Sequence, residues 1–281
     1  PTVYKSSAAS DVYKRQLHHC TVTLRTSYRS SGPIAAVAAE LRQRAAQGAA
    51  PLSALRPSLG ALPPDANLRW LEASPRRLPP PLLQRLEDHL RQLQRLAEDC
   101  RPGEESGERA LLRQRDRLLV LSPLRRGRWG LEAIHRSLLG ATLEAPPARW
   151  PGGTPVVCRR NLPELGLANG DVGILLAGEG DSRQQRLLFG EPAGVDPPFR
   201  VHPAQLAGAV EPALALTVHM AQGSEAEEVI VLLPPGCETE ASLLYTALTR
   251  ARSRAMLITP AGEALDPPQM RNDPDQAEPP P

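Results

Sequence analysis

The chain has 281 residues, 41% of them hydrophobic, and a formal net charge of +2. This length suits one large domain or two small ones, and the apolar content is sufficient to fill a core. The near-neutral charge excludes a polycation, so a nucleic-acid surface would have to be a local basic patch. The lack of an apolar stretch of about 18 residues excludes a transmembrane helix.

The N-terminal segment differs in composition from the rest of the chain. Lys5 and Lys14 are the only lysines, and arginine supplies every later basic charge. We therefore expect residues 1–16 to be a non-native arm, with the native protein beginning upstream of Leu17. A native disordered arm is the alternative. The four cysteines lack the spacing of zinc ligands, so no metal site is predicted.

Residues 17–150 alternate between apolar runs and helical patterns. A short strand over 21–31 is expected to lead into a helix from Pro33 to about Ala46, and a buried strand follows at 117–123. Residues 51–110 form an insertion that begins with an irregular stretch, rich in Pro and Leu, up to residue 81. Its second part predicts an amphipathic helix with Leu86, Leu90 and Leu93 on one face.

The pattern of apolar and turn-forming residues changes at residue 151. Short apolar segments punctuated by Gly and Pro over 151–210 are typical of a small β-barrel or meander. Residues 211–262 return to apolar strands, at 213–218, 229–233 and 254–260, with a helix over 241–252. Such strands alternating with a helix indicate a parallel sheet, so we predict an α/β domain interrupted by a small β-module. The tail, 263–281, is expected to be disordered.

The loop that follows the 213–218 segment is unusually polar. Thr217 and His219 stand where a parallel strand ends, which is where such sheets bind ligands. Gly223 would let the backbone approach a ligand closely, and Glu225 could accept from a sugar hydroxyl. Thr217 and His219 could donate to phosphate oxygens. A turn that only caps itself is the alternative.

Three further clusters combine arginine with aromatic or apolar side chains. Tyr28 beside Arg29 offers a stacking ring and a phosphate donor, or is a surface turn. Arg250 lies deeper in the 241–252 helix than a basic residue that only complements the helix dipole. The third cluster follows the 117–123 strand and suits single-stranded nucleic acid: Arg125, Arg126, Arg128 and Trp129. The alternative is a solvated loop with Trp129 in the core.

In this order, the clusters resemble the C-terminal half of RecD-like superfamily 1 helicases. "LTVHMAQGSEAEEVIVLLP" looks like helicase motif V, "LLYTALTRARSRAMLI" like motif VI and "LRTSYRSSGPIAAVA" like motif IV. "PVVCRRNLPELGLANGDVGIL" is similar to the family's segment leading into an inserted SH3-like subdomain. The resemblance implies the second RecA-like motor domain with an inserted SH3-like β-barrel, and the first motor domain missing.

The resemblance also implies roles for the singled-out residues. Arg250 would be the arginine finger toward the γ-phosphate of ATP, and Arg29 a second arginine there. The nucleotide would also meet Tyr28, Gln222, Gly223 and Glu225. Single-stranded DNA would meet the arginine cluster with Trp129, the motif V residues Thr217 and His219, and the insert residues Asn161, Asn169 and Asp171.

Two departures from the family pattern bear on activity. Met220 and Ala221 replace the Lys and Ser of the family's "HKSQG". No lysine follows Lys14, so the phosphate loop G-x-x-x-x-G-K-[ST] is absent, and the Mg²⁺ ligands are expected in the missing N-terminal half. We therefore expect a cytoplasmic 5′ to 3′ DNA helicase fragment that cannot hydrolyse ATP alone.

Two questions stay open at this point. The helicase could act alone or with the other subunits of an exodeoxyribonuclease V complex, for which the helix in the insertion would offer a surface. The alternative function is a non-catalytic nucleic-acid-binding or scaffold subunit that retains the helicase fold.

Overall fold

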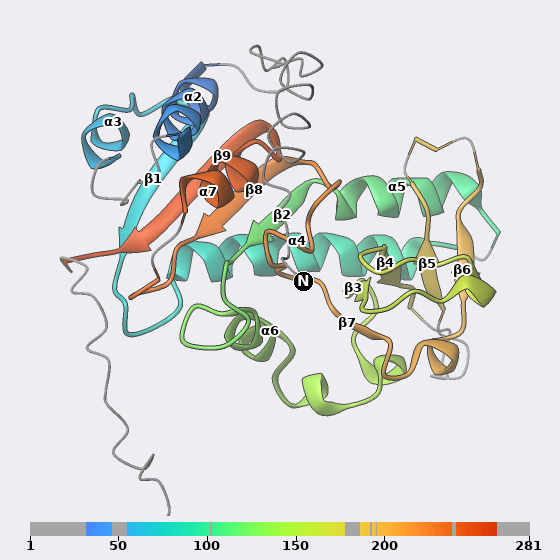
Figure 1. The fold of residues 1–281 in the computed structure, drawn as a ribbon. Helices are drawn as coiled ribbons and strands as arrows, with labels where there is room; N and C mark the ends of the chain where they lie inside the picture. Colours follow the sequence, from blue (N-terminus) through green and yellow to red (C-terminus); the bar gives the residue numbers. More distant parts are fainter. Residues whose placement is uncertain are drawn as a thin grey trace, which may run out of the picture.

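A computed structural model describes residues 32–46, 55–101, 103–177, 186–191, 193–194, 196–237 and 240–262. Its centre is a parallel sheet of four strands in the order β1-β9-β8-β2 (Figure 1). The strands are β1 (Leu68–Ala73), β2 (Leu118–Leu121), β8 (Ala226–Leu232) and β9 (Ala251–Pro260). This arrangement confirms the predicted mixed α/β fold with a parallel sheet and fits a RecA-like domain.

Helices cover both faces of this sheet because its inner strands are apolar on both sides. Val229 and Val231 of β8 pack with α2 (Gly32–Ala46), α3 (Arg56–Gly60) and α7 (Ala241–Leu248). Ile230 and Leu232, which alternate with them, pack with α4 (Pro80–Asp99) and α6 (Leu131–Leu139). The result is a three-layer α/β/α arrangement.

A second, antiparallel sheet lies in the chain between β2 and β8. Its strands are β3 (Pro155–Cys158), β4 (Val172–Leu175), β5 (Leu187–Phe189), β6 (Phe199–Val201) and β7 (Val210–Pro212), in the order β6-β5-β4-β3-β7. Short 3-10 turns flank them at Gly140–Glu144, Pro147–Arg149, Pro163–Leu165 and Pro203–Leu206. Gly173 in β4 must lack a side chain, since a Cβ there would lie 2.6 Å from a ring carbon of Phe189.

The helices α4 and α5 (Glu105–Arg115) connect the two sheets. α4 packs its first half on the parallel sheet, and its second half shares a core with α5 and the antiparallel strands β4 and β5. Arg109 of α5 donates to the carbonyls of Glu191, Gly194 and Asp196, and Arg115 donates to the carbonyl of Val172. The helical pair therefore braces the antiparallel sheet against the parallel one.

Three expectations from the sequence are wrong. The stretch 51–81 is not irregular throughout, because it contains α3 and the edge strand β1, which pairs with β9. Residues 213–218 form no full strand: only Leu216 bridges to Leu121. The helix over 241–252 ends at Leu248, so Arg252 and Arg254 lie on β9.

The described helices include none with the combination of length and apolarity that spanning a bilayer requires.

Candidate functional site

The loop 217–225 folds into successive tight turns between Leu216 and β8. The Thr217 hydroxyl accepts a hydrogen bond from the Met220 N–H at 3.2 Å, and the Thr217 carbonyl accepts from the Ala221 N–H at 3.1 Å. Gly223 has a φ of +90°, which only glycine adopts without strain. Thr217 thus caps the loop, which is the expectation for a turn that caps itself. His219 and Gln222 are exposed to solvent.

Arg250 meets this loop from the turn between α7 and β9. Its Nη1 donates to the Ser224 carbonyl at 3.4 Å, and its own carbonyl accepts from the Ala226 N–H at 3.1 Å. The guanidinium Nε is buried and has no hydrogen-bond partner among the described residues. A buried donor without an acceptor is costly, so this atom is a place where the fold leaves a polar group unsatisfied.

Glu225, which immediately precedes β8, forms an ion pair with the neighbouring strand β9. Its Oε2 lies 3.0 Å from Nε of Arg252, which stands on β9. The sequence pattern placed Arg252 at a helix C-terminus, but the short α7 brings it opposite Glu225 instead. The Glu225 side chain remains about a quarter exposed, so part of the carboxylate stays accessible beside Gly223.

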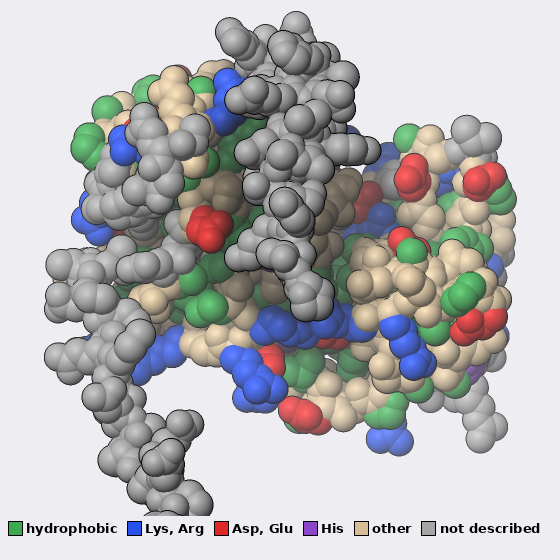
Figure 2. Space-filling view, in the orientation of Figure 1, with side chains coloured by type: hydrophobic (Ala, Val, Ile, Leu, Met, Phe, Trp, Pro, Cys, Tyr) green, Lys and Arg blue, Asp and Glu red, His purple; other side chains and the backbone are tan. Residues whose placement is uncertain are grey.

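The arginines after β2 lie in an exposed loop. Arg125 pairs with Glu211 of β7 at 2.7 Å, Arg126 pairs with Glu132 at 3.2 Å, and Arg128 is exposed. Figure 2 shows Arg side chains gathered below the centre of this face, between α6 and the strands β3 and β7. Arginine side chains therefore gather at the junction of the two sheets, two of them in ion pairs.

The expectation that Trp129 offers an exposed stacking ring is wrong. Trp129 is 0% exposed, packs in the core between α4 and α6, and donates from Nε1 to the Arg77 carbonyl at 2.8 Å. An indole with its N–H satisfied gains more from burial than from exposure. The basic patch consequently has no aromatic platform from this residue.

Arg159, which the sequence reasoning missed, joins this patch from the end of β3. Its Nη1 lies 3.1 Å from the Met220 sulfur, and Nη1 of Arg125 lies 3.5 Å from the same atom. Met220 stands where the motif of RecD-like helicases has lysine, so two arginines from other segments supply positive charge at that position. The "CRRN" run, 158–161, was the available signal, but its proximity to Met220 depends on tertiary structure.

Asn161, Asn169 and Asp171 come together in the turn between β3 and β4. The Asn161 side-chain carbonyl accepts from the Asn169 N–H at 2.8 Å, and the Asp171 carboxylate accepts from the Ala168 N–H at 2.7 Å. Asn161 and Asn169 are exposed. The side chains of Asn161 and Asp171 shape the turn, which faces the loop that contains Met220.

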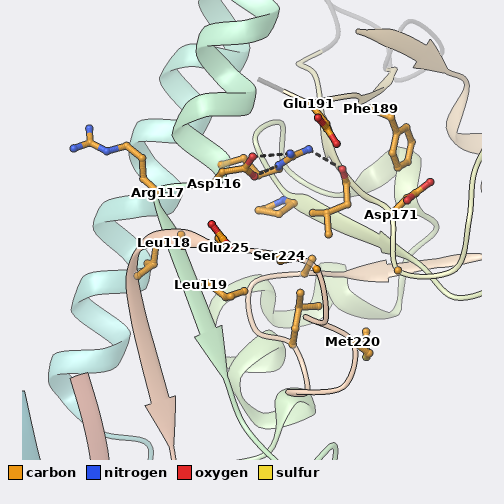
Figure 3. A pocket seen from close by; sticks show the side chains of 18 of the residues that line it. Asp116, Arg117, Leu118, Leu119, Asp171, Phe189, Glu191, Met220, Ser224 and Glu225 are labelled. Atoms are coloured by element: carbon orange, nitrogen blue, oxygen red, sulfur yellow. Dashed lines mark hydrogen bonds and ion pairs between the residues drawn. The ribbon is translucent and has the colours of Figure 1, made fainter. Parts of the chain in front are cut away.

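A cleft of about 1520 Å³ separates this turn from the motif V loop (Figure 3). Asn169 and Asp171 line one wall, and His219, Gly223 and Glu225 line the other. Arg250 is not among the lining residues, so it approaches the loop from outside the cleft. The loop therefore has two environments, one beside Arg250 and one facing the antiparallel sheet.

The predicted site residues Tyr28 and Arg29 lie outside the described residues.

Comparison with known proteins agrees with these motifs. Residues 212–258 match the UvrD-like helicase C-terminal domain. The RecBCD enzyme subunit RecD of Mycobacterium tuberculosis is 34% identical over 119 residues, which is 42% of this chain and 20% of that protein. The RecBCD enzyme subunit RecD of Mycolicibacterium smegmatis is 32% identical over 157 residues, which is 54% of this chain and 26% of that protein. The matched regions thus span about a fifth to a quarter of these relatives.

Solved structures of Pif1 helicases are similar over part of the chain. Bacteroides Pif1 bound to ssDNA aligns over 65% of this chain and 49% of that one, with 16% identity and a TM-score of 0.34. Pif1 helicase from Candida albicans aligns over 64% of this chain and 54% of that one, with 19% identity and a TM-score of 0.32. The family match and the RecD relatives, rather than these alignments, support a likeness of this chain to the C-terminal part of RecD-like superfamily 1 helicases.

Proposed function

We propose that this chain is the second motor domain of an ATP-dependent DNA helicase of the RecD type, which translocates 5′ to 3′ on single-stranded DNA in recombinational repair. The observation that carries the proposal is the contact of Arg250 with the Ser224 carbonyl. This contact supports the proposal because it joins the elements that resemble motifs V and VI.

On the nucleotide side, Arg250 would stabilise charge on the γ-phosphate of ATP, an effect of roughly 10³–10⁵ in rate for such arginines. Gln222, Gly223 and Glu225 would position the loop and the sugar, and Tyr28 and Arg29 would complete this wall. The described residues contain no cluster of three His, Cys, Asp or Glu side chains for a metal ion. The ligands of the Mg²⁺ that accompanies ATP are proposed to lie in a first motor domain.

On the DNA side, the arginines at the junction of the two sheets would bind the backbone of a single strand. Arg125, Arg126, Arg128 and Arg159 supply the charge, and Thr217 and His219 would add contacts from the motif V loop. The antiparallel sheet would act as an SH3-like barrel inserted in the motor domain. Its residues Asn161, Asn169 and Asp171 would lie along the strand as it passes the cleft.

The domain organisation follows from this assignment. Residues 17–150 and 211–262 would form the motor domain, 151–210 the insert, and 1–16 and 263–281 the terminal arms. No lysine follows Lys14, so the chain has no phosphate loop of the G-x-x-x-x-G-K-[ST] type and would not hydrolyse ATP alone. The other subunits of an exodeoxyribonuclease V complex are its proposed protein partners.

Binding of a labelled single strand to the 281-residue chain tests the DNA side of the proposal. The double substitution Arg125→Gln/Arg159→Gln is expected to weaken binding about tenfold at 0.1 M salt. It should also flatten the plot of log K against log[salt] by about 1.4, since each lost phosphate contact contributes about 0.7. Arg76→Gln/Arg77→Gln, which removes the same charge from an exposed turn, is the control. Equal losses in both variants would overturn the assignment.

A further inference from the structure

A second basic surface lies on α4, apart from the arginines at Arg125 and Arg159. It is a groove of about 400 Å³ in which five of the eight lining residues are arginines: Arg85, Arg91, Arg95, Arg117 and Arg254. Asp88 and two glutamines complete it. The chain as a whole carries a formal charge of only +2, so this concentration of arginine is a local feature.

The groove is assembled from distant parts of the chain. Arg91 and Arg95, four residues apart, stand on the face of α4 opposite its buried leucines, and Arg85 lies at the side of that face, where it is half-buried against Glu228. Arg117 precedes β2, and Arg254 lies on β9. Figure 3 shows Arg117 directed away from the acidic side chains Asp116, Asp171 and Glu191 of the neighbouring cleft. The fold therefore gathers these guanidiniums on one surface.

Ion pairs hold four of the five arginines, and the groove still carries a net positive charge. The largely buried Glu228 accepts from Arg85 at 2.9 Å and from Arg254 at 3.4 Å. Asp88 and Glu227 hold Arg91 and Arg117, and Arg95 has no acidic partner among the described residues. Three carboxylates thus face five guanidiniums. Each guanidinium has five N–H donors, so most donors remain available to an anion.

The lining chemistry distinguishes between kinds of anionic partner. All eight side chains are charged or amide, and none is apolar or aromatic. A protein interface ordinarily centres on buried apolar or aromatic anchors, which this groove lacks. The exposed Phe199 lines the cleft between the two sheets, whereas this groove offers a single strand no ring on which to stack its bases. The phosphate backbone of a duplex needs only fixed positive donors.

We propose that this arginine groove binds the phosphate backbone of duplex DNA independently of sequence. Arg85 and Arg95 are ten residues apart, which is about 15 Å along an α-helix. That length matches about four base-pair steps at 3.4 Å per step of one strand. The motor domain would then hold duplex on α4 while the single strand occupies the junction of the two sheets.

The test compares a blunt 20-base-pair duplex with a 20-nucleotide single strand, each labelled and titrated with the 281-residue chain over a salt series. Arg91→Gln/Arg95→Gln changes two exposed side chains that make no core contact. It is expected to weaken duplex binding about tenfold at 0.1 M salt and to flatten the salt dependence by about 1.8, at about 0.9 per contact. Single-strand affinity should change less than twofold.

Two controls separate this proposal from the preceding one. Arg76→Gln/Arg77→Gln removes equal charge elsewhere and should leave duplex affinity within twofold of the unsubstituted chain. Arg125→Gln/Arg159→Gln should weaken single-strand binding while the effect of Arg91→Gln/Arg95→Gln on duplex persists. Unchanged duplex affinity in the Arg91/Arg95 variant overturns the groove proposal alone. Polyglutamate, titrated in the same way, represents an acidic protein partner. If the Arg91/Arg95 variant loses polyglutamate binding while duplex binding stays intact, the groove proposal is overturned in favour of such a partner.

Discussion

Arg125 and Glu211 form an ion pair of 2.7 Å that joins the loop after β2 to strand β7. The same carboxylate lies 3.5 Å from Nε of Arg159, so one acidic side chain holds two arginines of the proposed single-strand surface. Its other oxygen, Oε1, is buried without a hydrogen-bond partner among the described residues. Glu211 therefore occupies donors that a phosphate would otherwise use.

Glu211→Gln is expected to tighten binding of a single strand about two- to fivefold. Removing the carboxylate raises the local positive potential by one charge, worth up to about 1 kcal/mol near the surface. Fluorescence anisotropy at fixed salt measures the change. The matched control is Glu144→Gln. Glu144 lies on the 3-10 turn after α6, and its carboxylate pairs with Arg136 of α6. Weaker binding by Glu211→Gln would mean instead that the carboxylate orients the two arginines.

Trp129→Ala is expected to act on stability rather than on DNA affinity. The side chain is fully buried and hydrogen-bonded, so its removal should lower the free energy of unfolding by about 3–5 kcal/mol. Urea unfolding measures this loss. Trp129→Phe, which keeps most of the volume but loses the N–H donor, should cost less. An unchanged unfolding midpoint together with weaker single-strand binding would show that the indole turns outward.

Glu108→Gln tests the brace between α5 and the antiparallel sheet. Glu108 is 5% exposed and forms an ion pair with Arg200 of β6, so losing its charge leaves Arg200 without its acidic partner. The expected cost is about 2–4 kcal/mol in the free energy of unfolding, discounted because Arg200 is partly exposed. Glu105→Gln, at the exposed pair with Arg109, should cost less than about 1 kcal/mol. Equal effects would refute the brace.

Two buried histidines predict a loss of stability in mild acid. Burial lowers the pKa of His89 to about 4, assisted by the charge of Arg85, and burial lowers the pKa of His135 to about 4. The unfolded chain titrates near 6.5, so it binds more protons than the folded chain between pH 6.5 and 4. The free energy of unfolding is therefore unaffected by these two groups above pH 6.5 and falls as the pH drops from 6.5 toward 4.

Chemical unfolding at pH 7 and pH 5 measures this effect, which is on the order of 3 kcal/mol per histidine at its limit. The double substitution His89→Gln/His135→Gln should flatten the dependence on pH, whatever its effect on stability at pH 7. A wild-type chain equally stable at both pH values would contradict the assignment.

The features predicted correctly are those with local signals. α4 followed from leucines at helical spacing, and β8 followed from a continuous apolar run. β1 was missed because its identity as a strand depends on pairing with β9, more than 180 residues away, and prolines surround it. Arg159 and Met220 are likewise brought together only by packing of the two sheets.

Trp129 shows the limit of composition as a guide to a site. Arginines beside a tryptophan suit single-stranded DNA equally well whether the ring points outward or inward, and only packing against α4 decides. Arg250 lies in the turn after α7 rather than in the predicted helix, and the pairing of β8 with β9 brings it to the motif V loop.

The central claim is that Arg250 acts on the nucleotide. Its most direct measurement is DNA-stimulated ATP hydrolysis by a polypeptide that joins this chain to a RecD-type first motor domain with a phosphate loop. Arg250→Ala should lower turnover about 10³-fold or more while single-strand affinity stays within twofold, and Arg136→Ala on α6 should leave turnover unchanged. Turnover retained by Arg250→Ala would contradict the account.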